Sequence, residues 1–166
     1  MAFSTNSLYF DDVEIGQEWE SSGRTVTEAD VVNFAALSGD RHPQHTDAQW
    51  ASDSPFGERI AHAMLVISLA AGLVPFDPER VVALRRVGDV VFKRPVRFGD
   101  TVHVRGRLTE LADAGAETGI VAFTWTVVNQ RDETVCRARV EVLWRRDVAR
   151  DEETHDVTNG FVPIPL

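Results

Sequence analysis

Residues 62–73 constrain the fold of this chain more than any other segment. Between His62 and Leu73 the residues are almost all apolar, in the order Ala, Met, Leu, Val, Ile, Ser, Leu, Ala, Ala and Gly. A helix of this composition is too apolar on all sides to lie on a protein surface. We therefore expect a buried helix, and the simplest way to bury it is a sheet wrapped around it. A chain of 166 residues, 43% of them hydrophobic, is long enough for one such domain with a real core.

The second half of the chain is rich in Val, Thr, Phe and Trp and contains stretches in which polar and apolar residues alternate. This pattern predicts strands over 87–96, 101–111, 118–129 and 134–144. Turns are expected at 98–100, 113–115 and 130–133, so that neighbouring strands pair antiparallel as a meander. A first strand around 19–26 would complete the sheet at its other end. The predicted fold class is α+β, with one domain over residues 1–146 and a charged C-terminal tail over 147–166.

A short helix should begin after Thr27, because its hydroxyl can accept an early N–H and Asp30 is favoured in the first turn. Apolar residues then recur at helical spacing, and Gly39 ends the helix. Asp40 is therefore expected just past the helix end. Residues 40–60 should form an ordered loop, with a turn of helix near 47–51. Long irregular segments in compact domains are usually functional.

Asp40 and His45 lie five residues apart on this loop, just ahead of the apolar helix. A carboxylate and an imidazole near the N-terminus of a buried helix can manage a water molecule on one side and a developing oxyanion on the other. The sequence therefore predicts a hydration site in outline. Metal binding is an alternative, because Asp40, His42, His45 and His62 are all of types that ligate zinc or iron. Pro43 on an irregular turn fits such a site poorly, and we predict no metal.

Overall charge and composition exclude several functions. A formal charge of −9 argues against nucleic acid as a partner. No window reaches the roughly 18 apolar residues of a membrane-spanning helix, and residues 1–7 lack a basic cluster followed by an apolar run, so we expect a cytoplasmic protein without a membrane partner. The single cysteine, Cys136, is expected in a strand and agrees with a reducing compartment. His103 and His155 are expected to be structural or solvated.

A local cluster of cations departs from the acidic average. Six basic residues lie within eighteen positions, namely Arg80, Arg85, Arg86, Lys93, Arg94 and Arg97. Such a cluster can bind a phosphate-bearing small molecule without the whole surface being basic. The alternative is that these are solvated side chains on the outer face of a strand.

Four motifs occur in order along the chain: YFDDVEIG at 9–16, SGDxxPxH at 38–45, FGxxIAHxML at 56–65 and FxxPVxxGDT at 92–101. With these motifs the chain resembles, over roughly residues 9–145, the MaoC-like dehydratase family, which includes the (R)-specific enoyl-CoA hydratases. The resemblance implies a single hotdog domain, a curved sheet folded around the buried helix, and a homodimer or higher homo-oligomer. It also implies addition of water to a trans-2-enoyl thioester, or its removal from an (R)-3-hydroxyacyl thioester. CoA or acyl carrier protein would be the carrier, with no other cofactor.

The resemblance also assigns residues. Asp40 and His45 match the catalytic pair, and the main-chain N–H of Ala63 matches the donor to the thioester oxygen. His62, Gly57 and His42 are expected around the oxyanion and substrate. The candidate contacts to CoA phosphates are Arg85, Arg86, Lys93 and Arg94.

Three positions depart from the usual pattern of the family. His42 stands where Asn is usual, Ala63 where Gly is usual, and Ala71 where many members have Ser. None of these changes removes the acid, the base or the donor. Two other functions remain open: an acyl thioesterase, which would hydrolyse the C–S bond, and a non-catalytic subunit that binds acyl thioesters. The second would be expected to lack the acid or the base, and this chain has both.

Overall fold

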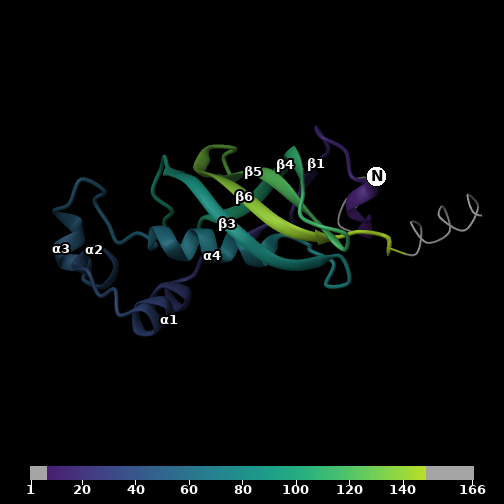
Figure 1. The fold of residues 1–166 in the computed structure, drawn as a ribbon. Coiled ribbons are helices and arrows are strands. Elements are labelled where there is room, and N and C mark those ends of the chain that lie inside the picture. Colours follow the sequence, from purple (N-terminus) through teal and green to yellow (C-terminus); the bar gives the residue numbers. More distant parts are fainter. Residues whose placement is uncertain (1–6, 149–166) are drawn as a thin grey trace, which may run out of the picture.

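The computed structural model describes residues 7–148, and these form an α+β domain in which an antiparallel sheet curves around helix α4 (Figure 1). The elements in chain order are η2 (Phe10–Asp12), β1 (Glu18–Glu20), β2 (Arg24–Thr25), α1 (Glu28–Ser38), α2 (Pro43–Thr46), α3 (Ala48–Ser52), α4 (Ala63–Leu73), β3 (Val81–Phe92), β4 (Thr101–Asp113), β5 (Thr118–Asn129) and β6 (Thr134–Arg145). Helices α1, α2 and α3 gather at one end of the molecule, beyond the first turn of α4 (Figure 1). The predicted fold class is confirmed.

The sheet has six strands in the order β1-β4-β5-β6-β3, with β2 also paired to β4. The expected meander is confirmed for β4, β5 and β6, and β1 and β2 do complete the far edge of the sheet. The expectation for β3 was wrong, because this strand covers Val81–Phe92 rather than 87–96 and pairs with β6.

The physical reason lies in the segment after β3. The N–H groups of Lys93 and Arg94 still donate to the carbonyl of Val135 in β6, and the chain then turns away from the sheet so that residues 96–97 pair with the segment that leads into α4. The N–H of Ala61 donates to the carbonyl of Val96 at 2.8 Å, and Ile60 forms an isolated bridge with Arg97. The turn at 98–100 therefore leads from β3, at one edge of the sheet, across to β4 beside the opposite edge, instead of closing a hairpin. This crossing also places residues 93–97 beside the start of α4.

Helix α4 packs on the inner face of the sheet, as predicted, but only along one side. Its buried residues are Leu65, Val66, Ile67, Leu69 and Ala70. They share one core cluster with the aromatic rings of Phe123, Trp125 and Trp144. Burial on all sides was a wrong expectation for the single chain, because Met64 is 61% exposed and Ser68 and Gly72 lie exposed on the same face. The sheet covers one face of this helix and leaves the other open.

The first helix follows its sequence signals closely. Thr27 and Asp30 form a reciprocal capping box at the start of α1. Gly39 ends the helix with φ of 78°, a left-handed conformation that glycine adopts without strain. The predicted turn of helix near 47–51 is confirmed as α3, whereas the short helix α2 was not predicted.

Two other predictions concern single residues and the tail. Cys136 is buried in strand β6, as expected, and burial raises the pKa of its thiol to about 11. His103 lies in β4, while His155 and residues 149–166 lie outside the described part of the chain, so the tail is not tested. Between residues 7 and 148, no helix is both long and apolar enough to cross a membrane.

Candidate active site

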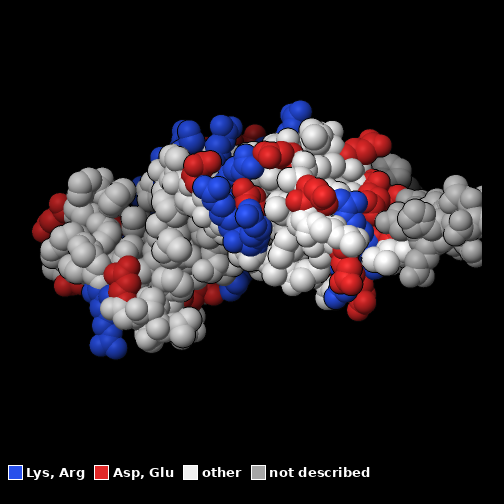
Figure 2. Space-filling view, viewed as in Figure 1, with Lys and Arg blue, Asp and Glu red and all other residues white. Residues whose placement is uncertain are grey.

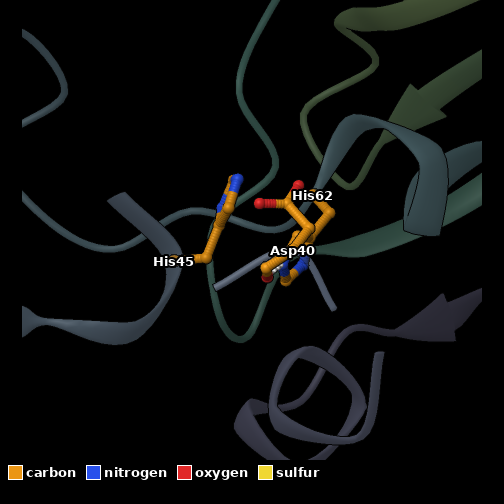
Figure 3. Close-up of side chains that lie close together, drawn as sticks. All are labelled: Asp40, His45 and His62. Carbon is orange, nitrogen blue, oxygen red and sulfur yellow. Dashed lines mark hydrogen bonds between the residues drawn. The ribbon is translucent and has the colours of Figure 1, made fainter. Parts of the chain in front are cut away.

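Three side chains from three separate segments meet at the start of α4. Asp40 follows α1, His45 lies in α2, and His62 immediately precedes α4. Figure 3 shows these side chains converging, and the atoms through which they can act all lie within 4.8 Å of one another. The acid and the base that the sequence singled out are therefore brought together, with a second histidine beside them.

His45 is held in one orientation by the backbone. Its Nδ1 lies 2.7 Å from the carbonyl oxygen of Ile60. Because a carbonyl only accepts, Nδ1 carries the proton and Nε2 keeps its lone pair. Gln44, the residue before His45, ties α2 to the same segment. Its side chain donates to the carbonyl of Glu58 at 2.9 Å, and its backbone carbonyl accepts the N–H of Ile60 at 3.3 Å.

Burial is the largest influence on the pKa of His45 and lowers it below the ordinary value for histidine. The hydrogen bond to Ile60 and the charge of Asp40 act in the opposite direction, while the neighbouring His62 and His42 also lower this pKa. The net shift is downward. His45 is therefore a neutral imidazole near neutral pH, with Nε2 available as a base.

His62 links the other parts of the site. Its ring is only 1% exposed and stacks on His45 with centroids 3.9 Å apart and planes 29° apart. Its Nε2 donates to the carbonyl oxygen of Asp40 at 2.9 Å, a bond drawn in Figure 3. Its Nδ1 is buried and has no hydrogen-bond partner in the described chain. His62 thus holds the backbone of the acid and supports the ring of the base.

The first turn of α4 is left open toward this cluster. His62 occupies the N-cap position, where a side chain usually accepts a hydrogen bond from the helix, but its side chain makes no such bond. The N–H of Ala63 has no intrahelical partner, because the first N–H groups of any helix lack one. The helix dipole adds partial positive charge at the same point. This end of α4 can therefore stabilise a negative oxygen.

The cluster fits a metal ion poorly. A ring nitrogen coordinates a metal in the plane of its ring, and the rings of His45 and His62 are stacked nearly parallel. Their in-plane lone pairs therefore run side by side rather than toward one point. One nitrogen of each ring is also occupied by a carbonyl group. The absence of a metal stays a prediction, which this geometry supports.

A pocket of about 480 Å³ opens beside the three side chains. Asp40, His45, His62 and Ala63 all line it. Its walls are otherwise mostly apolar and are formed by Phe34, Phe56, Ile60, Ala61, Met64, Val66, Phe92, Pro95, Val96 and Val135. The volume lies within the usual range for sites that bind small molecules. An apolar chain can fill this pocket while a polar group faces the acid and the base.

Comparison with known proteins identifies the family. The model of the MaoC like domain matches residues 12–130, which is more than half of the chain. The chain belongs to the MaoC-like domain family. A double-hotdog protein of Mycobacterium tuberculosis aligns with a TM-score of 0.75 at 23% identity, covering 86% of this chain and 45% of that protein, which shows that the fold is the hotdog.

Relatives of this MaoC-like chain include enzymes. It is 44% identical over 98 residues to Protein MaoC of Klebsiella aerogenes, covering 58% of this chain and 29% of that protein. It is 36% identical over 104 residues to 3-hydroxybutyryl-CoA dehydratase of Methylorubrum extorquens, covering 63% and 66%. The chain thus spans less than two thirds of the length of both relatives. A solved monoamine oxidase regulatory protein from Archaeoglobus aligns with a TM-score of 0.79 at 39% identity, covering 84% of this chain and 95% of that one.

Two residues that the resemblance placed near the substrate do not line the pocket of this MaoC-like domain. Gly57 lies in the turn after α3, where its N–H donates to the carbonyl of Ser54 at 3.0 Å. His42 caps α2, where its Nδ1 accepts the N–H of Gln44 at 3.1 Å. Each residue shapes the loop that carries the site rather than the pocket wall, and contact of either with a substrate stays a prediction.

The basic cluster divides into two groups. Lys93 and Arg94 line the pocket, whereas Arg85 and Arg86 do not. Arg85 and Arg86 both pair with Glu141 and lie outside the pocket, and their contact with CoA phosphates stays a prediction. Figure 2 shows blue side chains gathered over the sheet next to the helical end of the molecule.

Sequence reasoning missed most of the pocket wall. Phe34 belongs to the apolar stripe of α1, and its ring lies 5.0 Å from that of His62. Phe56, Phe92 and Pro95 stand within the quoted motifs, so the motifs were a signal that these positions approach the site. Nothing in the sequence pattern points to Val135, because it reaches the pocket through the pairing of β6 with the end of β3.

Proposed function

We propose that this MaoC-like domain is a hydratase and dehydratase of acyl thioesters. It adds water to a trans-2-enoyl thioester of CoA or acyl carrier protein, or removes water from the (R)-3-hydroxyacyl thioester. The observation that carries this proposal is the meeting of Asp40 and His45 beside the open first turn of α4, at the side of an apolar pocket. The dehydratase activity in the name of the Methylorubrum relative agrees with it.

The geometry supports a division of roles in the hydration step. Nε2 of the neutral His45 accepts a proton from water, which the Asp40 carboxylate holds from the other side as its oxygen bonds to the β-carbon. The double bond shifts, and negative charge gathers on the thioester oxygen. The proton returns from the same pair to the α-carbon, so water adds to one face of the substrate and the pair regains its starting state.

The thioester oxygen lies at the N-terminus of α4 in this mechanism. The N–H of Ala63 donates to it, and the helix dipole favours the developing charge. Both are already in place before the reaction, so no reorganisation is needed as the enolate forms. The methyl group of Ala63 narrows the space above the donor but does not remove it. Dehydration follows the same steps in reverse.

The carrier of the thioester explains the cations at the pocket. Arg94 is partly occupied, since it donates to the carbonyl of Thr134 at 3.2 Å and lies 3.6 Å from Glu133. Lys93 lines the pocket and makes no side-chain hydrogen bond or ion pair within residues 7–148. A free ammonium group here suits a phosphate of CoA or of a carrier-bound phosphopantetheine. Hydration changes no overall oxidation state, so we propose no cofactor beyond the carrier. A cytoplasmic location remains a prediction from the sequence.

We also propose that the enzyme is a homodimer. Strand β3 lies at one edge of the sheet and exposes several large apolar side chains, among them Val82, Leu84, Val87, Val91 and Phe92. Met64 adds to this surface from the open face of α4. An apolar strand edge left bare invites pairing, and a second copy would cover it symmetrically. Light scattering at micromolar concentration should show no monomer, and a clean monomer with full activity would contradict the proposal.

The test of function is a panel of trans-2-enoyl-CoA thioesters from four carbons upward. Loss of the enoyl absorbance without release of free thiol, and an (R)-configured product, are the expected results. Release of thiol would instead indicate a thioesterase. A folded protein that binds these thioesters and changes none of them would indicate the non-catalytic subunit.

A further inference from the structure

His42 lies outside the pocket but touches both members of the catalytic pair through its backbone. Its N–H donates to Oδ1 of Asp40 at 3.2 Å, and its carbonyl accepts the N–H of His45 at 2.9 Å. It is therefore the residue through which the position of the acid and the position of the base depend on each other. None of these bonds needs a histidine side chain, so the ring has a separate task.

The ring of His42 is the cap of α2. Its Nδ1 accepts the N–H of Gln44 at 3.1 Å, which is the bond that the oxygen of Asn, Asp or Ser usually provides. The ring also lies edge to face with the indole of Trp50 in α3, with centroids 5.4 Å apart and planes at 89°. The imidazole thus fixes the start of the short helix that carries His45 and packs it against the next helix.

A cap of this kind works in only one protonation state. Nδ1 can accept from Gln44 only while it carries no proton, so the ring must be neutral. An asparagine cap has no such requirement. Protonation of His42 would turn the acceptor into a donor facing another donor, and the bond that begins α2 would be lost.

On this basis, which rests on the proposed function, we propose that His42 is a positioning residue. Its neutral ring fixes α2 so that the His45 side chain keeps its position relative to Asp40. Protonation of this ring breaks the cap and frees α2 to move. The arrangement of the catalytic pair is therefore acid-sensitive through a residue that does not touch the substrate.

The surroundings of the ring agree with this role. The His45 ring lies 6.3 Å away, so a charged His42 would place a positive charge beside the base. The Asp40 carboxylate is already bonded to the His42 backbone. From α3, the charged neighbour is Asp47, whose carboxylate is occupied by the N–H groups of Gln49 and Trp50. Within residues 7–148, the His42 ring makes no ion pair with a carboxylate.

Two variants test the inference. His42→Asn supplies an oxygen that accepts the Gln44 N–H at any pH, whereas His42→Leu supplies no acceptor. We expect His42→Asn to keep kcat within about threefold of wild type at neutral pH and to hold its activity to lower pH. We expect His42→Leu to lose about tenfold or more in kcat with a smaller change in KM, because the pocket wall is intact and the pair is misplaced. His103→Asn on the outer part of the sheet is the matched control and should leave the pH profile unchanged.

Three kinetic results would overturn the inference. These are full kcat in His42→Leu, failure of His42→Asn to restore kcat, or a loss of activity at low pH that is the same in His42→Asn and in wild type. Hydrogen exchange at the Gln44 amide, followed by NMR, gives a readout that needs no activity. Protection of this amide should decrease in wild type as the pH is lowered, persist in His42→Asn and be absent in His42→Leu. Equal protection in all three proteins would also overturn the inference. If wild type hydrates no thioester, the proposed function fails, while the exchange data still decide whether the ring is an acid-sensitive cap.

Discussion

Glu141 in β6 and His62 before α4 are both buried polar residues, but their surroundings differ in kind. Glu141 is 6% exposed and pairs with three arginines, namely Arg85, Arg86 at 3.7 Å and Arg139 at 3.5 Å. His62 is 1% exposed, and one of its ring nitrogens has no partner in the described chain. The carboxylate is surrounded by partners, while the imidazole keeps one buried ring nitrogen without a partner beside the pocket.

This difference separates a structural site from a candidate catalytic one. A buried charge without partners destabilises a fold by several kcal/mol, so a charge kept for structure is paired. At the start of α4 the groups left available are those that a reaction would use: Nε2 of His45, the N–H of Ala63, and the Asp40 carboxylate, which lines the pocket and accepts one hydrogen bond, from the N–H of His42. Unsatisfied groups in a native structure call for an explanation, and a bound substrate with its water provides one.

Removing either member of the catalytic pair should have the largest effect. We expect Asp40→Asn and His45→Ala each to reduce turnover by about 10² to 10⁴, the range for general acid–base groups. In the proposed mechanism, either change leaves the water held from one side only. Turnover in the enoyl-CoA assay is the measurement, with circular dichroism as the check of folding. A folded variant that keeps more than about a tenth of wild-type turnover would remove that residue from the mechanism.

Loss of the oxyanion donor should have the second-largest effect on turnover. Ala63→Pro removes the N–H yet is sterically acceptable in the first turn of a helix, so we expect turnover to fall by about 10² to 10³ with little change in melting temperature. Ala63→Gly keeps the donor and restores the residue usual in the family, so it should be as active as wild type or faster. Normal turnover in a folded Ala63→Pro protein would show that the oxygen is held elsewhere.

Helix α1 and the segment before α4 show why some features were predictable from the sequence and others were not. Thr27, Asp30 and Gly39 act within a few residues of themselves, so the bounds of α1 follow from local chemistry. The pairing of β3 with β6 depends on residues 93–97 joining the start of α4, a contact between distant segments that no local pattern encodes. The same holds within the site. The motifs predicted that Asp40 and His45 act together, but the stacking of His62 on His45 appears only once three segments are folded together.

A substitution at Glu141 should change the stability of the protein and not its rate of turnover. Glu141→Gln keeps the shape of the side chain and removes its charge, so Arg85 and Arg86 lose their partner while Arg139 keeps Glu110 at 2.8 Å. We expect the free energy of unfolding to fall by about 1–2 kcal/mol, less than for a fully buried pair because the arginines are partly exposed. Denaturant titration measures this, and kcat of the remaining folded protein should equal that of wild type. A loss of kcat without a loss of stability would mean that the Glu141 cluster is part of the site after all.

Lys93 resembles His62 rather than Glu141, because it lines the pocket and its charged group has no hydrogen-bond or ion-pair partner in the described chain. If it binds a carrier phosphate, Lys93→Met should raise KM for a four-carbon enoyl-CoA by about three- to tenfold, the scale of one exposed charge-assisted contact. The same variant should leave KM unchanged for the matching pantetheine thioester, which carries no phosphate. Arg86→Met is the matched control, because Arg86 already pairs with Glu141 and lies outside the pocket. An equal rise in KM for both thioesters would instead show that Lys93 shapes the pocket through its methylene chain and does not bind the phosphate.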